Sequence, residues 1–519
     1  MSTPPPDELG AAIGRFRDLR RRFEQAIPAV AVSMDGRSFG YQLAIGSTVS
    51  PPGGFVALVD GDSRRLGQLI TQELVTRDGP EVGASLDGES LAGDGALDVQ
   101  ARVQVRIVEG TGVVLSGDGA PFVDARIEQA SGPEVEELAR PKRDTTELVI
   151  GTVPAGRDEF VPARIDAGGF DRHTFLCGQS GSGKTYSLGV VLEQLLLNTE
   201  LRVVVIDPNS DFVRLREARA DADPALAARL QALAPSILVR SSTAGGDDRL
   251  RIRFPELDGA AYAGVLHLDP IRDSNEYDEL LRALAEGPSS PAYQALATGS
   301  TDTMSEGLDR LIRRVRNLGV DRFGVWAREQ AGTVLEDLDR DDWRCLVVDI
   351  GTLGTPTEKT LVAQAVLTRL WEKRLERRPL LVVIDEAHNV CPQLPDGGLQ
   401  FLATETAIKI AAEGRKFGLY LLLSTQRPQK VHENIVSQCD NLLLMRMNSV
   451  ADVGHLTDVF SFVPPSLLAR ATGFRQGEAL VAGKVVPTPT FVRFGARVSE
   501  EGGSDVPTDW ARPAHGIER

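Results

Sequence analysis

One short segment, Gly178 to Thr185, constrains the fold of this chain more than any other part of the sequence. It has the sequence GQSGSGKT and fits the pattern G-x-x-x-x-G-K-[ST]. The residues HTFLC before it are typical of a buried strand, and YSLGVVLEQLLL after it is typical of a helix. Glycines let such a loop curl so that several backbone N–H groups point at one phosphate cluster, and the helix N-terminus adds partial positive charge. The segment therefore predicts an α/β fold of the P-loop NTPase type.

The loop also predicts roles for single side chains. We expect Lys184 to bridge the terminal phosphates of ATP and Thr185 to bind Mg²⁺ through its hydroxyl group. ATP and Mg²⁺ are thus the predicted cofactors. The residues expected to bind the nucleotide are Gly178, Gln179, Ser180, Gly181, Ser182, Gly183, Lys184, Thr185 and Tyr186.

A second motif places two acids at the end of another apolar strand. Leu380 to Ile384 is wholly apolar, and Asp385 and Glu386 follow it directly. A carboxylate at a strand end suits a ligand that holds Mg²⁺ through water, a role we assign to Asp385. Glu386 is then placed to orient or deprotonate the attacking water. Two adjacent acids are also compatible with the start of a solvated loop, but the P-loop upstream favours the catalytic interpretation.

Two further polar residues follow these strands. The strand at 418–424 is followed by Thr425 and Gln426, and a polar residue at the end of such a strand can sense the γ-phosphate if the strand lies beside the P-loop strand. We predict that role for Gln426, although Pro428 would end the strand in either case. His388, in DEAHNV, is compatible with a metal ligand, but no second ligand is near. A local hydrogen bond is the favoured interpretation.

Arginines are harder to assign. Phosphoryl transfer benefits from a guanidinium on the transferring phosphate, and a neighbouring subunit often supplies it. Arg415, in AAEGRKFG, and Arg172, at the edge of the strand before the P-loop, are the candidates. Most surface arginines are only solvated or paired with acids, so these residues alone leave both assignments open.

Composition narrows the class of protein. A chain of 519 residues suggests two or more domains. The net charge of −16 argues against a protein that coats DNA with its outer surface, but is compatible with a ring that holds DNA in a narrow basic channel. No run of eighteen or more uncharged apolar residues occurs, and no basic-then-apolar leader is present. We therefore expect a cytoplasmic protein without a membrane-spanning helix.

The pattern along the chain predicts four parts. Short β-branched runs with near period-two alternation indicate a small N-terminal β-barrel or sandwich, of which we predict the barrel. Apolar strands that alternate with helices then indicate a parallel sheet buried on both faces. Between about 255 and 342 the strands stop, which predicts a helical insertion. The expected parts are an N-terminal helix (1–28), the β-barrel domain (29–145), the ATPase domain (146–495) and a polar tail (496–519).

Four segments together carry a resemblance to a known family. They are DRHTFLCGQSGSGKT, VVIDEAHNVCP, AAEGRKFGLYLLLSTQRPQKVHENIVSQCDNLLLMRMNSVADVGHL and GFRQGEALVAGKVVPTPTFVRF. From about residue 30 to 495 the chain resembles the HerA family of hexameric DNA translocases, relatives of the FtsK motors. Its β-rich N-terminal part is similar to the barrel that HerA proteins share with rotary ATP synthase subunits.

The resemblance implies a RecA-like core, a homo-oligomeric ring of six subunits and nucleotides at the subunit interfaces. Arg172 and Arg415 match positions that the family uses as interface arginines, and the C-terminal segment is expected to reach toward a neighbouring subunit. Family members drive double-stranded DNA through the ring, often with a nuclease, and others serve in anti-phage systems beside an effector.

The leading hypothesis is thus an ATP-dependent double-stranded DNA translocase or helicase with a nuclease or effector partner. The alternative is an ATP-gated ring scaffold that regulates a partner effector with little translocation. A motor for protein secretion or conjugation shares these motifs and stays open as a third class.

Overall fold

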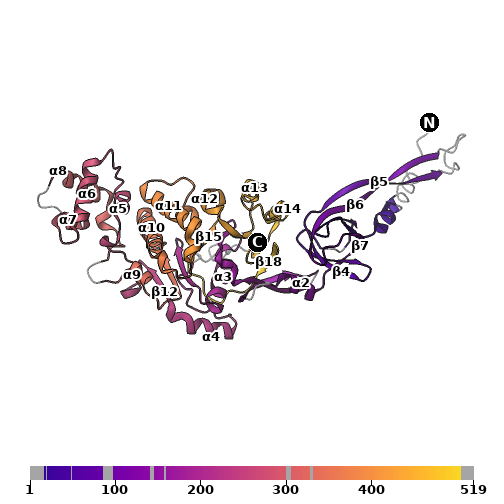
Figure 1. Ribbon diagram of the computed structural model, residues 1–519, viewed down its shortest axis with the longest axis horizontal. Coiled ribbons are helices and arrows are strands. Elements are labelled where there is room, and N and C mark those ends of the chain that lie inside the picture. The colour runs from indigo at the N-terminus through magenta and orange to yellow at the C-terminus, as the bar shows by residue number, and fades with distance from the viewer. Residues whose placement is uncertain are drawn as a thin grey trace, which may run out of the picture. The chain divides into compact units, whose positions relative to one another are not determined.

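The computed structural model divides the chain into two compact units, each described by itself (Figure 1). The first is built from Met1–Arg140, Thr152–Pro162 and Pro464–Leu467, and the second from Pro141–Gly151, Ala163–Val463 and Leu468–Arg519. The structure describes residues 17–18, 20–47, 50–85, 98–140, 145–156, 159–299, 305–327 and 331–503. Most of the predicted N-terminal helix lies outside the described residues, although 20–26 are helical, and so does the tail from 504 onward.

The first unit confirms the predicted β-barrel. Seven antiparallel strands follow the order β2-β1-β7-β3-β4-β6-β5, and an additional β2–β6 pairing closes six of them into a barrel. Alternate residues of β2, such as Phe39, Tyr41 and Leu43, are buried and fill the interior. The bounds are β1 Val30–Ser33, β2 Ser38–Ala44, β3 Phe55–Asp60, β4 Ser63–Leu69, β5 Glu73–Ser85, β6 Asp98–Ser116 and β7 Phe122–Gln129.

A glycine in β6, Gly112, leaves room for an aromatic side chain in the interior of the barrel. A Cβ atom on Gly112 would lie 2.1 Å from the ring of Phe39. Any larger residue there would displace an aromatic side chain from the core of a small barrel.

The second unit confirms the predicted parallel sheet. Its eleven-stranded sheet has the order β12-β13-β11-β14-β15-β10-β16-β17-β18-β8-β9, and the pairs from β12 to β16 are parallel. Every residue of β10, β13 and β14 is buried, as expected for strands covered on both faces. The bounds are β8 Glu147–Pro154, β9 Phe160–Asp166, β10 His173–Cys177, β11 Arg202–Asp207, β12 Ile237–Ser241, β13 Cys345–Asp349, β14 Leu380–Ile384, β15 Leu419–Thr425, β16 Cys439–Met445, β17 Glu478–Gly483 and β18 Thr490–Phe494.

The order of the strands positions the site. β10 lies between β15 and β16, while β11 and β14 lie on the other side of β15. In such sheets ligands bind in the crevice beyond the carboxyl ends of the strands, where neighbouring connections diverge. The loops after β10, β11, β14 and β15 therefore converge on one place. Helix α3 (Lys184–Asn198) begins there, directly after the P-loop.

The predicted helical insertion is present. It contains α5 (Gly259–Val265), α6 (Ser274–Glu286), α7 (Pro291–Thr298), α8 (Glu306–Leu318) and α9 (Val334–Asp339). Figure 1 shows α5 to α8 grouped beyond α10 (Pro356–Glu372) and α11 (Gly398–Glu413), and α5 packs directly against α11.

An aromatic cluster links the start, middle and end of the insertion. The ring of Phe254 lies 4.3 Å from that of Tyr262, 5.3 Å from that of Tyr293 and 5.5 Å from that of Trp326, measured between centroids. Such contacts join segments that are far apart in the sequence. Across the described part of the chain, none of the helices has the length and apolar character needed to span a bilayer.

Candidate active site

The P-loop is held in place by the strands on both sides of β10. The backbone N–H of Gly178 donates to the carbonyl of Thr425 at 3.3 Å, and that of Gln179 donates to the carbonyl of Arg446 at 2.9 Å. Gly181 and Gly183 have φ angles of 73° and 92°, a left-handed conformation that other residues rarely adopt. The glycines of the motif are therefore required by the backbone path, which leaves the loop open toward the cavity.

Lys184 joins the P-loop to the two acids that follow β14. Its Nζ atom lies 3.0 Å from Oδ1 of Asp385 and 3.1 Å from Oε1 of Glu386, and it also donates to Oγ of Ser424 at 3.1 Å. All three charged side chains are buried. Burial opposes the charge on the lysine, but the two carboxylates outweigh it and raise the pKa of Lys184. The structure therefore brings these three residues together, while their roles stay predictions.

Several buried polar atoms at this place have no hydrogen-bond partner among the described residues. They include Oδ2 of Asp385, Oε2 of Glu386 and Oγ of Ser182. Buried polar atoms are nearly always satisfied, so a group of unsatisfied ones beside a phosphate-binding loop indicates a polar ligand. The donor set fits a nucleotide and its metal ion.

The described residues contain no group of three or more His, Cys, Asp or Glu side chains arranged to hold a metal ion by themselves. Mg²⁺ is usually held by one or two protein ligands together with phosphate oxygens. The hydroxyl of Thr185 and the unpaired oxygen of Asp385 would be those ligands.

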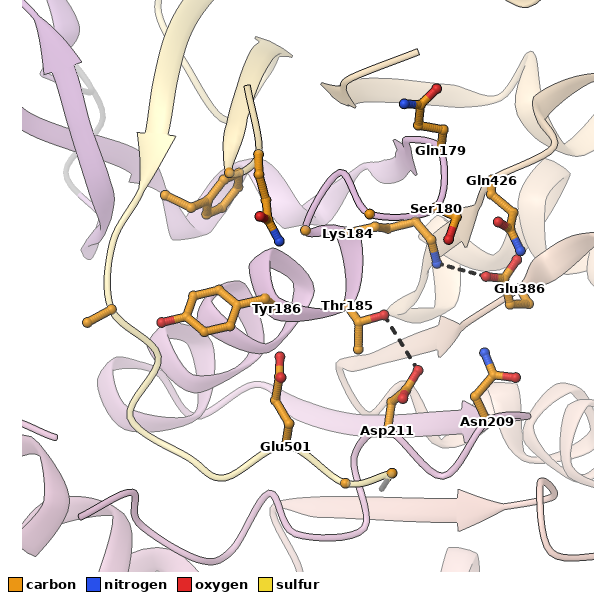
Figure 2. A pocket seen from close by; sticks show the side chains of 18 of the residues that line it. Gln179, Ser180, Lys184, Thr185, Tyr186, Asn209, Asp211, Glu386, Gln426 and Glu501 are labelled. Carbon is orange, nitrogen blue, oxygen red and sulfur yellow. Dashed lines mark hydrogen bonds and ion pairs between the residues drawn. The ribbon is translucent and has the colours of Figure 1, made fainter. Parts of the chain in front are cut away.

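The loop after β11 supplies two carboxylates that the sequence analysis missed. Oγ1 of Thr185 lies 3.5 Å from Oδ2 of Asp211, and Figure 2 shows Asp211 directed at the cavity. Asp207, at the end of β11, accepts hydrogen bonds from the backbone N–H groups of Asn209, Asp211 and Phe212 at 2.8–3.2 Å. The signal was the apolar strand LRVVVID, which ends in an acid in the same way as the strand before Asp385.

Both carboxyls are perturbed by their surroundings. Burial, followed by repulsion from Asp211 and Asp385, raises the pKa of Asp207 to about 7, although backbone hydrogen bonds oppose the change. Burial and the nearby Asp385 carboxylate raise the pKa of Asp211 to about 6. An excess of buried negative charge therefore gathers around Thr185, as expected where a cation and a bound ligand are accommodated.

Gln426 contributes to the same cavity from the end of β15. Figure 2 shows it beside Glu386, and both residues line the cavity. His388 does make a local hydrogen bond, through Nδ1, to the hydroxyl of Thr425 at 3.0 Å. The structure thus places the predicted sensor residue next to the predicted catalytic acid.

The cavity itself is large and open, with a volume of about 1170 Å³. The far side of the cavity is formed by C-terminal residues, among them Arg493, Phe494 and Glu501. The phenol oxygen of Tyr186 accepts a hydrogen bond from the backbone N–H of Arg497 at 2.7 Å, which ties the P-loop helix to this wall. The remaining lining residues are Gln179, Ser180, Gly181, Gly183, Lys184, Thr185, Asn209, Asp211, Glu386, Gln426, Gln476, Gly477, Gly495, Ala496, Gly502 and Gly503.

We name residues 497–503 the C-terminal strap, because they fasten this wall to α3. The guanidinium of Arg497 is wholly buried and lies 3.3 Å from Oε1 of Glu193 on α3. Glu193 also accepts hydrogen bonds from the backbone N–H groups of Val498 and Ser499 at 2.7 and 2.8 Å. Gly189 leaves the room for this contact, since its Cβ would lie 2.5 Å from the guanidinium carbon. The sequence analysis assigned these residues to a polar tail and predicted no role for them in the nucleotide cavity.

Arg172 and Arg415 do not reach this cavity. Arg172 directly precedes β10 and Arg415 precedes β15, so both lie at the amino ends of strands whose carboxyl ends carry the site. A five-residue strand separates the two ends by roughly 16 Å. Both arginines instead approach Asp440, with Arg415 Nη1 at 2.8 Å and Arg172 Nε at 3.6 Å from its Oδ2. Within one chain they are not part of the site.

The strand order, the P-loop and the acids after β14 define a RecA-like P-loop ATPase. A family model described as "Helicase HerA, central domain" matches residues 148–317. The chain is 25% identical over 364 residues to the DNA double-strand break repair helicase HerA of Pyrococcus furiosus, covering 62% of this chain but only 65% of that protein. It is 22% identical over 483 residues to the protein of the same name from Saccharolobus solfataricus, covering 87% of this chain and 89% of that one. The resemblance to the HerA family is thereby confirmed.

A solved structure supports the fold. VirB4 of Thermoanaerobacter pseudethanolicus superposes with a TM-score of 0.50 at 15% identity, covering 69% of this chain and 98% of that one. The chain is thus similar to the HerA helicases and has the fold of RecA-like P-loop ATPases.

Proposed function

We propose that this chain is an ATPase of the HerA type, and that hydrolysis drives double-stranded DNA through a ring of identical subunits. The observation that carries the proposal is the position of Lys184, within 3.1 Å of both Asp385 and Glu386 at the edge of one large cavity. A buried lysine between two acids and beside a phosphate-binding loop is arranged to exchange its partners for phosphate oxygens.

The chemistry follows from the positions of the side chains. ATP would bind with its phosphates in the curl of the P-loop and draw Nζ of Lys184 away from the two carboxylates. Glu386 would then be free to take a proton from the attacking water, while Gln426, at the end of β15, would contact the γ-phosphate. A Mg²⁺ ion held by Thr185 and Asp385 would neutralise charge on the phosphates.

The arginines suggest why the chain would act as a ring. Arg172 and Arg415 lie at the strand ends opposite to their own P-loop, and each side chain is partly exposed. In a ring they would be presented to the site of the next subunit and stabilise the charge that develops on its γ-phosphate. Six subunits is the number that the family resemblance implies.

The similar proteins support DNA as the substrate, since they are DNA double-strand break repair helicases. We also propose a nuclease or effector as partner, because no nuclease motif accompanies the ATPase site in the sequence. The net charge of −16 is also compatible with an alternative function, that of an ATP-gated scaffold that regulates an effector with little translocation.

The deciding experiment is the steady-state ATPase rate with and without linear duplex DNA, with Glu386→Gln as the background. Stimulation by duplex that weakens as salt rises would support the translocase. Turnover that is indifferent to DNA would favour the scaffold. Full turnover by Glu386→Gln would show that the site has been misassigned.

A further inference from the structure

His388 lies beside the predicted catalytic acid, which Lys184 also approaches. Its Nδ1 atom lies 3.3 Å from Oε2 of Glu386, the oxygen that has no hydrogen-bond partner, while Lys184 approaches the other oxygen. The side chains of both His388 and Glu386 are largely buried, at 11% and 8% exposed. The Glu386 carboxylate therefore lies close to two nitrogens, one from α3 and one from the turn that follows β14.

The backbone at Glu386 is strained as well. Its φ angle is 44°, in the left-handed region that costs a non-glycine residue free energy. Such a conformation persists only where the surroundings fix it, and it is common where a side chain must be aimed at a ligand. The 3₁₀ turn Ala387–Asn389, which carries His388, begins directly after this residue.

The same Nδ1 atom connects to the end of β15. It lies 3.0 Å from Oγ1 of Thr425, and this hydroxyl accepts a hydrogen bond from the backbone N–H of Arg427 at 3.0 Å. Thr425 precedes Gln426, the predicted phosphate sensor. One imidazole nitrogen is thus shared between the predicted catalytic acid and the strand end that carries the sensor.

The turn after β15 is fastened to the loop after β14. The backbone N–H of Gln393 donates to the carbonyl of Lys430 at 2.8 Å, and that of His432 donates to the carbonyl of Cys391 at 3.1 Å. We call residues 389–397 and 426–432 the loop pair, because these bonds join them into one unit. Leu394, at 85% exposed, lies in this unit, so the loop pair reaches the surface.

The charge state of the imidazole suits a hydrogen-bond donor. Burial lowers the pKa of His388, and the cations of Arg427, Lys184 and Lys430 act in the same direction, while Glu386 opposes them. A neutral imidazole carries one N–H, and a proton on Nδ1 is favoured because a carboxylate and a hydroxyl oxygen both face that atom.

We propose that His388 is a positioning residue that aims Glu386 at the attacking water and makes that aim depend on the conformation of the loop pair. The proposal rests on the proposed function of Glu386. When Lys184 turns to the phosphates of ATP, the approach of His388 to the Glu386 carboxylate would remain. A shift of the loop pair would move Thr425, and with it the imidazole and the carboxylate that it orients.

The test uses the full-length protein and the substitutions His388→Ala and His388→Asn. The amide nitrogen of asparagine occupies about the place of Nδ1, so His388→Asn should retain most activity. We expect His388→Ala to lower kcat for ATP by about 10- to 100-fold with little change in KM. A wrongly oriented Glu386 carboxylate would slow the hydrolysis step without weakening the binding of ATP. His455→Ala, a histidine on α13 (Val450–Val459) away from the lining residues, is the matched control and should retain the kcat of the unsubstituted protein.

The link to the loop pair is tested with Thr425→Val, which keeps the shape of the side chain but removes the hydroxyl. We expect its kcat to fall by about threefold, since the imidazole loses one of its two oxygen partners. An unchanged kcat in Thr425→Val would overturn the link to the loop pair. A kcat near that of the unsubstituted protein in His388→Ala, or equal losses in His388→Ala and His388→Asn, would overturn the positioning role.

Glu386→Gln separates these results from a failure of the proposed function. If Glu386→Gln is inactive while His388→Ala turns over normally, only the role of His388 is wrong. If Glu386→Gln turns over normally, the proposed function of Glu386 fails first. Binding of a fluorescent ATP analogue by every variant, measured in parallel, identifies any that has lost its fold.

Discussion

The two ends of strands β10 and β15 carry opposite kinds of polar chemistry. At their carboxyl ends lie the P-loop and Lys184, with the buried acids after β14 beside them. At their amino ends lie Arg172 and Arg415, both partly exposed and close to one surface acid, Asp440, which is itself 42% exposed. One end is rich in buried carboxylates and the other presents cations to solvent.

Under the proposed function, this difference means that one chain would hold two unlike halves of a site. The carboxyl ends hold what is needed to bind phosphates and activate water. The arginines at the amino ends are paired with the surface carboxylates of Asp171 and Asp440, contacts of a kind worth under about 1 kcal/mol, so they can exchange them for a phosphate at little cost. If the amino ends of these strands in one chain packed against the carboxyl ends in a second chain, the two halves would meet at one nucleotide.

Lys184→Ala should have the largest effect, because it removes the cation on which the carboxyl-end half depends. The phosphates lose a charge-assisted contact, and Asp385 and Glu386 lose the charge that compensates theirs. We expect kcat/KM for ATP to fall on the order of 10³-fold. The binding of a non-hydrolysable ATP analogue, measured by calorimetry, should weaken in parallel. Tight analogue binding by Lys184→Ala would contradict this account of the buried cluster.

Glu193→Gln should have the next largest effect, on stability. It leaves the buried Arg497 guanidinium without its main counter-charge, a change that costs about 3 kcal/mol or more in comparable sites. We expect a clear fall in the urea midpoint of the second unit. Asp440→Asn is the matched comparison at the amino ends, where the ion pairs are exposed, and should shift the midpoint very little. Equal shifts of the urea midpoint in Glu193→Gln and Asp440→Asn would contradict the proposed difference between the buried ion pair and the exposed ion pairs.

Arg415→Ala should lower turnover by about 100-fold without weakening nucleotide binding. The loss stays below the 10³ or more attributed to a single arginine finger, because Arg172 remains. The informative measurement mixes Arg415→Ala chains with Lys184→Ala chains. If the arginine acts on the next subunit, mixed assemblies contain sites with an intact P-loop and an intact arginine, and activity rises above that of either variant. Mixtures that stay inactive at every ratio would argue against a shared site.

The sequence predicted the carboxyl-end half more fully than the rest, for a physical reason. The P-loop and the acids after β14 are local patterns, in which a strand, a turn and a helix N-terminus follow one another along the chain. The β-barrel and the parallel sheet were predictable because burial imposes alternation on one and continuous apolar strands on the other. The helical insertion was predictable from the loss of those strand patterns.

The parts that were missed depend on contacts between distant segments. Glu193 and Arg497 are 304 residues apart in the sequence, and nothing local marks either as buried. Asp211 lies four residues beyond the end of β11, in a loop whose course is set by the carboxylate of Asp207. The strap and the place of Asp211 in the site therefore became visible only when the chain was folded.

Asp211→Asn should have the smallest effect, and its sign depends on pH. The pKa of Asp211 is raised from 3.8 to about 6, first by burial and then by Asp385. Since the folded pKa exceeds the unfolded value, the charged carboxylate costs free energy of unfolding. This cost is absent below about pH 4, grows as pH rises to about 6 and stays constant above. The substitution removes the cost, so the nucleotide-free variant should unfold a few degrees higher than the unsubstituted protein at pH 8, with the gain shrinking at pH 5 and vanishing near pH 4.

Asp221→Asn is the control for that gain. Asp221 is exposed, and its pKa is lowered by Arg219, so its substitution should give no gain at pH 8. Magnesium and ATP should raise the unfolding temperature of the unsubstituted protein more than that of Asp211→Asn, because the bound cation compensates the charge that the variant lacks. An Asp211→Asn variant that is less stable than the unsubstituted protein at pH 8 would mean that Asp211 stabilises the empty site. The negative charge at the carboxyl ends of the strands would then not be explained by the binding of a ligand.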